Sequence, residues 1–290
     1  MKSQLTIFNK PIHHPAGVII KENTPSQSPP KIVSCLAYGL VSVSITLFNK
    51  AIFSVFKFQY PTFVTLVQVV LSIVFMVLLG EAGVIDFRMK SGGGIFGLRW
   101  AKAKKLFPLA LFWMLYVQSG VLALRYLTVP MFSALRRSTT LIAAVGEYIV
   151  FGKVMPCPSM AAVLVMVAGA VLAGATDLSF NATGYAWLSV CVFSTAAFLI
   201  LIRTLGEELE LNQHALLLYN NVLSLPMMLI WFLLATDEPK SVFSAPQWRD
   251  PSFVAFLLIS ASQAFLLNLC VFWCTTVNSA LVTTIVGESN

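Results

Sequence analysis

The chain has 290 residues, of which 58% are hydrophobic and only 11% are charged, and its formal net charge is +7. A soluble domain carries roughly a quarter charged residues, so this chain has too few to cover a water-facing surface. Its repeated apolar runs of about 20 residues are long enough to cross a bilayer core of about 30 Å. The sequence therefore predicts an all-α integral membrane protein in contact with the lipid bilayer.

The predicted elements follow a polar N-terminal segment. Residues 1–30 are rich in proline and serine, which is typical of a disordered tail. From residue 31 onward, apolar windows predict eight membrane spans, several of which begin at a proline, where a missing N–H costs least. The first of them is expected to act as the targeting signal. The predicted spans are 32–53, 61–79, 106–125, 130–150, 158–175, 183–202, 213–234 and 252–275.

Lysine and arginine residues predict the orientation of these spans. With a cytosolic N-terminus, the tail and loops on that side carry twelve of them and the opposite side carries four. This bias also accounts for the net charge, so a nucleic-acid partner is not needed. Asn181, Ala182 and Thr183 form a glycosylation sequon on the non-cytosolic side. The sequon lies close to the next span, and a short polar turn is the alternative interpretation.

The stretch SALRRSTT at 133–140 is similar to SALVTTIVG at 279–287, which lies 146 residues later. The predicted spans of the two halves are related by approximately the same shift. Two halves of five spans, 31–176 and 177–290, would enter the membrane from opposite sides, as in an inverted-repeat transporter. After Gly287 the sequence reads Glu-Ser-Asn and ends. We therefore expect about eight full spans, a partial ninth beginning near residue 276 and no tenth, and reduced activity as a consequence.

Cations inside predicted spans are candidate ligands for an anionic substrate, because burying charge in lipid is expensive. They are Lys50, Arg136 and Arg137, and arginine suits the bidentate binding of phosphate oxygens. Neighbouring residues on a continuous helix point about 100° apart. We therefore expect one arginine to bind phosphate and the other to pair or to extend toward the interface. The alternative is that both arginines only anchor a helix near the interface.

Polar side chains in the later spans suggest a site for a nucleotide base. Asn220 and Asn221 offer paired donors and acceptors, and Tyr219 can stack on a base. Hydrogen bonding between helices is the alternative. Weaker candidates of the same kind are Asn49, Gln68, Gln118, Ser119, Gln263 and Asn268.

Glu147 is the only carboxylate deep in an internal span. Proton-coupled carriers normally need buried carboxylates as relays, so exchange of one anion for another is the better mechanism. The sequence contains no nucleophile–base pair, no metal-ligand cluster and no P-loop, and the glycine-rich stretch at 91–97 is interpreted as a linker. We therefore expect neither an enzyme nor a cofactor.

Four stretches of the sequence are characteristic: LFNKAIF at 47–53, LTVPMFSALRRSTT at 127–140, LYNN at 218–221 and NSALVTTIVG at 278–287. Together they resemble the nucleotide-sugar transporters of the drug/metabolite transporter superfamily, in particular their UDP-sugar branch, with its UDP-N-acetylglucosamine and UDP-glucuronate carriers. The resemblance implies a multi-pass antiporter of the Golgi or endoplasmic-reticulum membrane with ten helices in two inverted halves. It would exchange cytosolic nucleotide sugar for lumenal nucleoside monophosphate.

The resemblance also implies roles for particular residues. In this family a YNN motif lies by the nucleotide base, and a Gly-x-x-Asn-Lys or Gly-x-x-Lys-Asn motif brings a lysine to the phosphates. Tyr219, Asn220, Asn221 and Gly287 match these motifs here, whereas the lysine is absent. Ser279 and Thr283, in the same stretch as Gly287, are further candidate substrate ligands. The alternatives are a triose-phosphate-type carrier and a non-transporting regulatory partner of a full-length form, and a homodimer is one option for the assembly.

Overall fold

A computed structural model of the chain describes residues 28–85, 100–152, 181–288 and, between 160 and 172, residues 160–161, 163–165, 167–169 and 172. The predicted tail at 1–30 lies almost entirely outside these residues. Within the described ranges every regular element is a helix. The predicted all-helical class is confirmed for this part of the chain.

Six long helices are apolar and long enough to cross a membrane, within the described residues. They agree with predicted spans one, two, three, six, seven and eight, although α3 and α7 extend further than expected. The helix α1 continues at its end into a π-helical turn, η1 (Ala51–Val55). The six are α1 (Ser28–Lys50), α2 (Pro61–Glu81), α3 (Trp100–Tyr126), α7 (Ala182–Leu209), α8 (Gln213–Ala235) and α9 (Pro251–Val277).

The predicted fourth span, 130–150, is not one helix. It is divided into α4 (Val129–Arg136) and α5 (Thr139–Phe151). At the break the amides of Ser138 and Thr140 donate to carbonyls three residues back, and the Thr139 hydroxyl donates to the Arg136 carbonyl at 2.6 Å. Side-chain competition for that carbonyl and tightening of the turn interrupt the regular α-helical hydrogen bonds.

The predicted fifth span, 158–175, lies largely outside the described residues, and those of it that are described are helical. The partial ninth span corresponds to α10 (Ala280–Glu288), a helix of nine residues. Its start lies a few residues after the predicted one.

Side chains cap several helix starts. The Asn181 side chain accepts a hydrogen bond from the Gly184 amide at 3.2 Å, and Asn212 caps α8 in the same way at 3.0 Å. The sequon asparagine therefore has a structural role at the start of α7. The start of α2 is capped from far away in the chain: the buried Glu238 carboxylate accepts from the amides of Thr62 at 3.1 Å and Phe63 at 2.8 Å.

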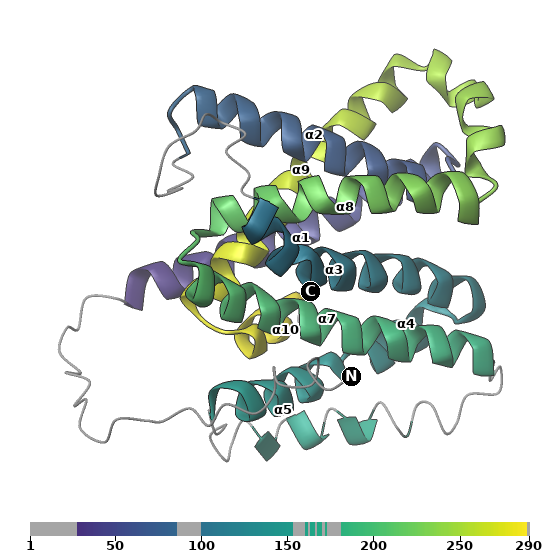
Figure 1. Cartoon of the computed structure of the whole chain (residues 1–290). Helices are drawn as coiled ribbons and strands as arrows, with labels where there is room; N and C mark the ends of the chain where they lie inside the picture. The colour runs from purple at the N-terminus through teal and green to yellow at the C-terminus, as the bar shows by residue number, and fades with distance from the viewer. Residues whose placement is uncertain are drawn as a thin grey trace, which may run out of the picture.

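The long helices form a bundle (Figure 1) in which α3 packs along α7 and α1 packs along α9. Helices α2 and α8 pack against each other, and they also contact α9 and α3 respectively. The shorter α5 packs on α7 and on α10. The main apolar core lies where α2, α3, α7, α8 and α9 meet.

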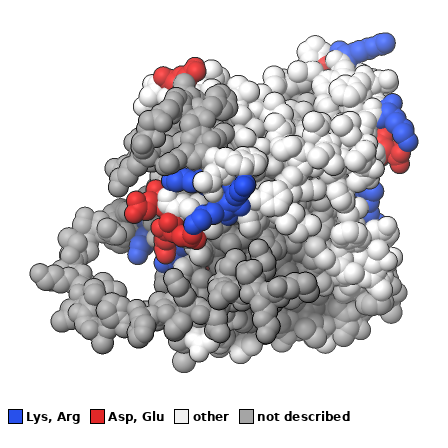
Figure 2. Space-filling model, viewed as in Figure 1, with Lys and Arg blue, Asp and Glu red and all other residues white. Residues whose placement is uncertain are grey.

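Charged residues lie at the two ends of the bundle, and the surface between them is almost uncharged in the view of Figure 2. We call one end the basic end, because it is the side that the lysine and arginine count assigns to the cytosol. It holds the starts of α1 and α3 and the end of α7, with Lys31, Lys102, Lys105 and Arg203, of which Lys105 pairs with Glu208 and Arg203 with Glu207. Large apolar side chains on the flanks face outward, such as Leu36 and Leu40 of α1, which are 62% and 75% exposed. A bilayer would cover such a surface.

Candidate functional site

A cavity of about 520 Å³ lies inside the bundle, between α1 and α4. Helices α3, α5, α7, α9 and α10 complete its walls. The volume falls in the range of sites for small molecules, which is roughly 300–1,000 Å³. Its lining includes Tyr38, Ser42, Thr46 and Asn49 of α1, Tyr116 of α3, Ser133, Arg136 and Arg137 at α4, Thr139 of α5, Thr195 of α7, Asn268 of α9, and Thr283, Thr284 and Gly287 of α10.

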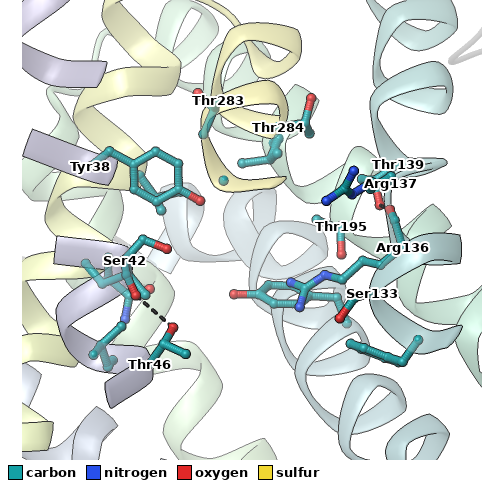
Figure 3. Close-up of a pocket in the computed structure, with 18 of the residues that line it drawn as sticks. Tyr38, Ser42, Thr46, Ser133, Arg136, Arg137, Thr139, Thr195, Thr283 and Thr284 are labelled. Carbon is teal, nitrogen blue, oxygen red and sulfur yellow. Dashed lines mark hydrogen bonds between the residues drawn. The ribbon is translucent and has the colours of Figure 1, made fainter. Parts of the chain in front are cut away.

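The cationic wall consists of Arg136 and Arg137. Both line the cavity, and Figure 3 shows both guanidinium groups pointing into it. The expectation that only one of them would face the cavity is wrong. Arg137 is the residue after α4, in the turn before α5, and its backbone stays in the right-handed helical region. The length of the arginine side chains, rather than a change in backbone direction, therefore brings both guanidinium groups to the cavity. Arg136 also lies 5.7 Å from the centroid of the Phe132 ring, a cation–π contact.

The opposite wall is a stripe of polar side chains on α1. Tyr38, Ser42 and Thr46 are spaced four residues apart and share one helix face (Figure 3). The Thr46 hydroxyl donates to the Ser42 carbonyl at 2.8 Å. Sequence reasoning missed this stripe, although polar residues at such spacing within an apolar span are a signal that could have found it.

At the end of the stripe, Asn49 is held by neighbouring helices. Its side-chain oxygen accepts from the Ser260 hydroxyl of α9 at 2.7 Å and from the Gln68 amide of α2 at 3.3 Å. Gln68 donates to Ser260 as well, at 3.0 Å. This network supports hydrogen bonding between helices as the role of Gln68, whereas Asn49 does this and lines the cavity too.

The third wall comes from α10. Thr283, Thr284 and Gly287 line the cavity, as Figure 3 shows for the two threonines. A Cβ at Gly287 would collide with the Tyr38 hydroxyl, so a larger residue here would require the Tyr38 side chain to move. Ser279 is not in the lining: its hydroxyl accepts from the Val282 amide at 3.2 Å and caps α10.

The remaining predicted ligands lie elsewhere in this conformation. Lys50 is exposed at the end of α1 and does not line the cavity. Tyr219, Asn220 and Asn221 of α8 are at most 1% exposed and lie in the core. Asn221 donates to the Ser72 hydroxyl of α2 at 2.7 Å. Both polar atoms of the Asn220 side chain are buried without a hydrogen-bond partner in the described part of the chain.

The charges favour an anionic ligand. No aspartate or glutamate is among the described residues that line the cavity, and neither Arg136 nor Arg137 forms an ion pair with a described acidic residue. Two uncompensated guanidinium groups next to neutral hydroxyl and amide groups attract negative charge, and arginine can bind a phosphate through two hydrogen bonds at once. The described residues contain no cluster of metal-ligating side chains.

These features define a multi-pass helical membrane protein with an internal cavity suited to an anion. The family model of the Triose-phosphate Transporter family matches residues 32–289, and the chain belongs to that family. The family consists of transporters, not enzymes. This confirms the resemblance found in the sequence to carriers of the drug/metabolite transporter type.

Several characterised carriers are similar to the chain over most of its length. A UDP-N-acetylglucosamine transporter of Arabidopsis thaliana is 34% identical over 259 residues, which are 88% of this chain and 75% of that protein. A UDP-sugar transporter of Drosophila melanogaster is 31% identical, covering 89% of this chain and 66% of the relative. A GDP-mannose transporter of Arabidopsis thaliana is 30% identical, with 89% and 77% covered.

Proposed function

We propose that the protein carries nucleotide sugars, UDP-linked ones in particular, across the Golgi membrane in exchange for nucleoside monophosphate. The observation that carries this proposal is that Arg136 and Arg137 lie together in a cavity whose other described lining residues are uncharged. The guanidinium groups bind the diphosphate, and the hydroxyl-bearing wall of α1 faces the less charged part of the substrate. The similarity to carriers of UDP-sugars and GDP-mannose supports this substrate class.

The packing of the helices supports two related halves, 31–176 and 177–290. In two related halves, α1, α2 and α3 of the first half would correspond to α7, α8 and α9 of the second. The pair α1–α9 then corresponds to α7–α3, and the pair α2–α9 corresponds to α8–α3. All four of these pairs are packed in the bundle. An inverted repeat would produce this pattern, and it supports alternating access by movement of the halves around a central site.

The unpaired side chain of Asn220 supports a role for the YNN motif in binding. A buried amide without partners is destabilising, by roughly 1–3 kcal/mol in mutational data. Such a cost is typical of groups kept for function rather than for folding. We propose that a conformational change gives the nucleotide base access to Asn220, so that the base edge completes its hydrogen bonds.

Exchange rather than proton coupling is supported by the position of Glu147. It is buried in α5, within the predicted fourth span, and its Oε1 accepts a hydrogen bond from the Leu281 amide at 3.2 Å. Glu147 is also absent from the lining of the cavity. An anion leaving on each cycle balances the charge of the anion that enters.

The test is uptake by purified protein in liposomes preloaded with UMP, GMP or CMP and supplied with labelled UDP-, GDP- or CMP-sugars. We expect uptake of UDP-sugars that requires internal UMP. Uptake of triose phosphates without nucleotide sugars would contradict the proposal and favour the triose-phosphate alternative. Absence of all uptake, together with altered uptake by a co-reconstituted longer relative, would favour a regulatory role.

A further inference from the structure

The start of α10 is held in place by a buried carboxylate from the other half of the chain. Glu147 of α5 is 4% exposed, and its Oε1 accepts from the amide of Leu281, the second residue of α10, at 3.2 Å. No described lysine or arginine forms an ion pair with it. A carboxylate is favourable here because it meets an otherwise unpaired N–H at the positive end of a helix.

Asn278, two residues before this helix start, is held by two further helices. Its side chain donates to the Ser34 hydroxyl of α1 at 3.0 Å, and its backbone carbonyl accepts from Arg203 of α7 at 3.5 Å. Arg203 lies 4.7 Å from the centroid of the Phe151 ring, at the end of α5. Contacts from α1, α5 and α7 therefore converge on the start of α10, at the basic end of the bundle.

The position of α10 links these contacts to the cavity. From its start the helix runs inward, and within two turns it presents Thr283, Thr284 and Gly287 to the cavity. It packs on α1, α5, α7 and α9, and Figure 1 shows it beside α5 and α7. Anything that detaches its start therefore removes one wall of the cavity on the side of the basic end.

We propose that Glu147 is a positioning residue that closes the basic end of the cavity by holding the start of α10 on α5. Release of the Leu281 amide allows α10 to move away from α5 and opens the cavity toward that end. Glu147 does not touch the substrate; it acts through the position of Thr283, Thr284 and Gly287.

The experiment measures access to the cavity from one side of the membrane. Thr284→Cys is made in the full chain after replacement of the natural cysteines, and the protein is placed in sealed vesicles with the basic end outward. The rate of labelling by a charged, membrane-impermeant maleimide is then compared with and without Glu147→Leu. We expect labelling to increase by about tenfold or more, as loss of one charge-assisted hydrogen bond would produce.

Three further variants separate positioning from general loosening. Glu147→Gln keeps an oxygen acceptor and should stay within about twofold of the parent. Leu281→Pro removes the donor in a first turn that tolerates proline, and it should increase labelling even if Glu147→Leu folds poorly. Combining Glu147→Leu with Leu281→Pro should add little to either change alone, because both remove the same bond.

The matched control is Glu238→Leu. Glu238 is also a buried carboxylate that caps a distant helix start, but it caps α2 at the opposite end. It should lower the melting temperature and leave labelling at residue 284 unchanged. Equal labelling in Glu147→Leu and its parent, or an equal increase in Glu238→Leu, would overturn the proposal. Labelling needs no substrate, so the result does not depend on the transported molecule.

Discussion

At the scale of single residues, the cavity depends on two adjacent arginines that both face inward. Two guanidinium groups on one short segment can bind a diphosphate from two directions, which one residue could not do alone. Their freedom from ion pairs with described acids keeps both guanidinium groups available to a ligand.

We predict that Arg136→Gln and Arg137→Gln each raise the nucleotide-sugar concentration for half-maximal uptake by about tenfold or more. The physical reason is the loss of a charge-assisted hydrogen bond to phosphate. Arg125→Gln is the control, because Arg125 is an exposed residue of α3 outside the cavity lining. Uptake in preloaded liposomes measures the effect, and equal losses in all three variants would argue against phosphate binding at α4.

A second prediction concerns the neighbours Asn220 and Asn221, which are equally buried but differently bonded. Asn220→Leu removes an amide without partners, whereas Asn221→Leu removes the partner of Ser72. We expect Asn220→Leu to be more stable than Asn221→Leu by about 1–2 kcal/mol. Thermal unfolding in detergent measures the difference, and uptake by Asn220→Leu should be lost. A variant of Asn220 that transports normally would exclude it from the site.

At the scale of elements, close contacts between helices set the shape of the cavity wall. The start of α7 lies against the end of α3, and Gly184 makes this possible. A Cβ at Gly184 would lie 2.8 Å from Cβ of Tyr126 and 2.9 Å from Cγ of Leu127. These distances are too short for an unshifted side chain.

We therefore predict that Gly184→Ala lowers the free energy of unfolding by about 1–3 kcal/mol through overpacking. Gly169→Ala is the matched control, because nothing lies within 4 Å of the Cβ that it would add. It should be neutral or slightly stabilising, since alanine favours the helix. Melting temperatures of the two variants in the same detergent give the comparison. An unchanged melting temperature in Gly184→Ala would mean that α3 and α7 can separate easily.

At the scale of the whole molecule, the charged residues at the two ends predict its orientation in the membrane. The basic end is expected to face the cytosol, because positively charged loops stay on that side. Ala101→Cys lies at the start of α3 on this end, and Ser241→Cys lies between α8 and α9 at the other; both positions are exposed. An impermeant thiol reagent applied to sealed vesicles whose cytosolic face is outward should label the cysteine at 101 and spare the one at 241. The reverse pattern would invert the topology.

The sequence by itself was sufficient for the place of the six long helices that the structure describes, but not for the predicted fourth span, which is divided into α4 and α5. It also pointed to Arg136, Arg137, Thr283 and Gly287 as candidate ligands of one substrate. These features are local: about 20 apolar residues partition into a bilayer whatever follows them, and a charge inside such a run is conspicuous wherever it occurs.

Only the tertiary structure decided which polar side chains face the same space. Both arginines reach the cavity although they are neighbours on a helical backbone, and the stripe of Tyr38, Ser42 and Thr46 became a wall because α4 and α10 lie opposite it. Glu147 meets Leu281 from 134 residues away. The physical reason is that hydropathy belongs to a segment, whereas the partner of a polar group is set by the packing of distant helices.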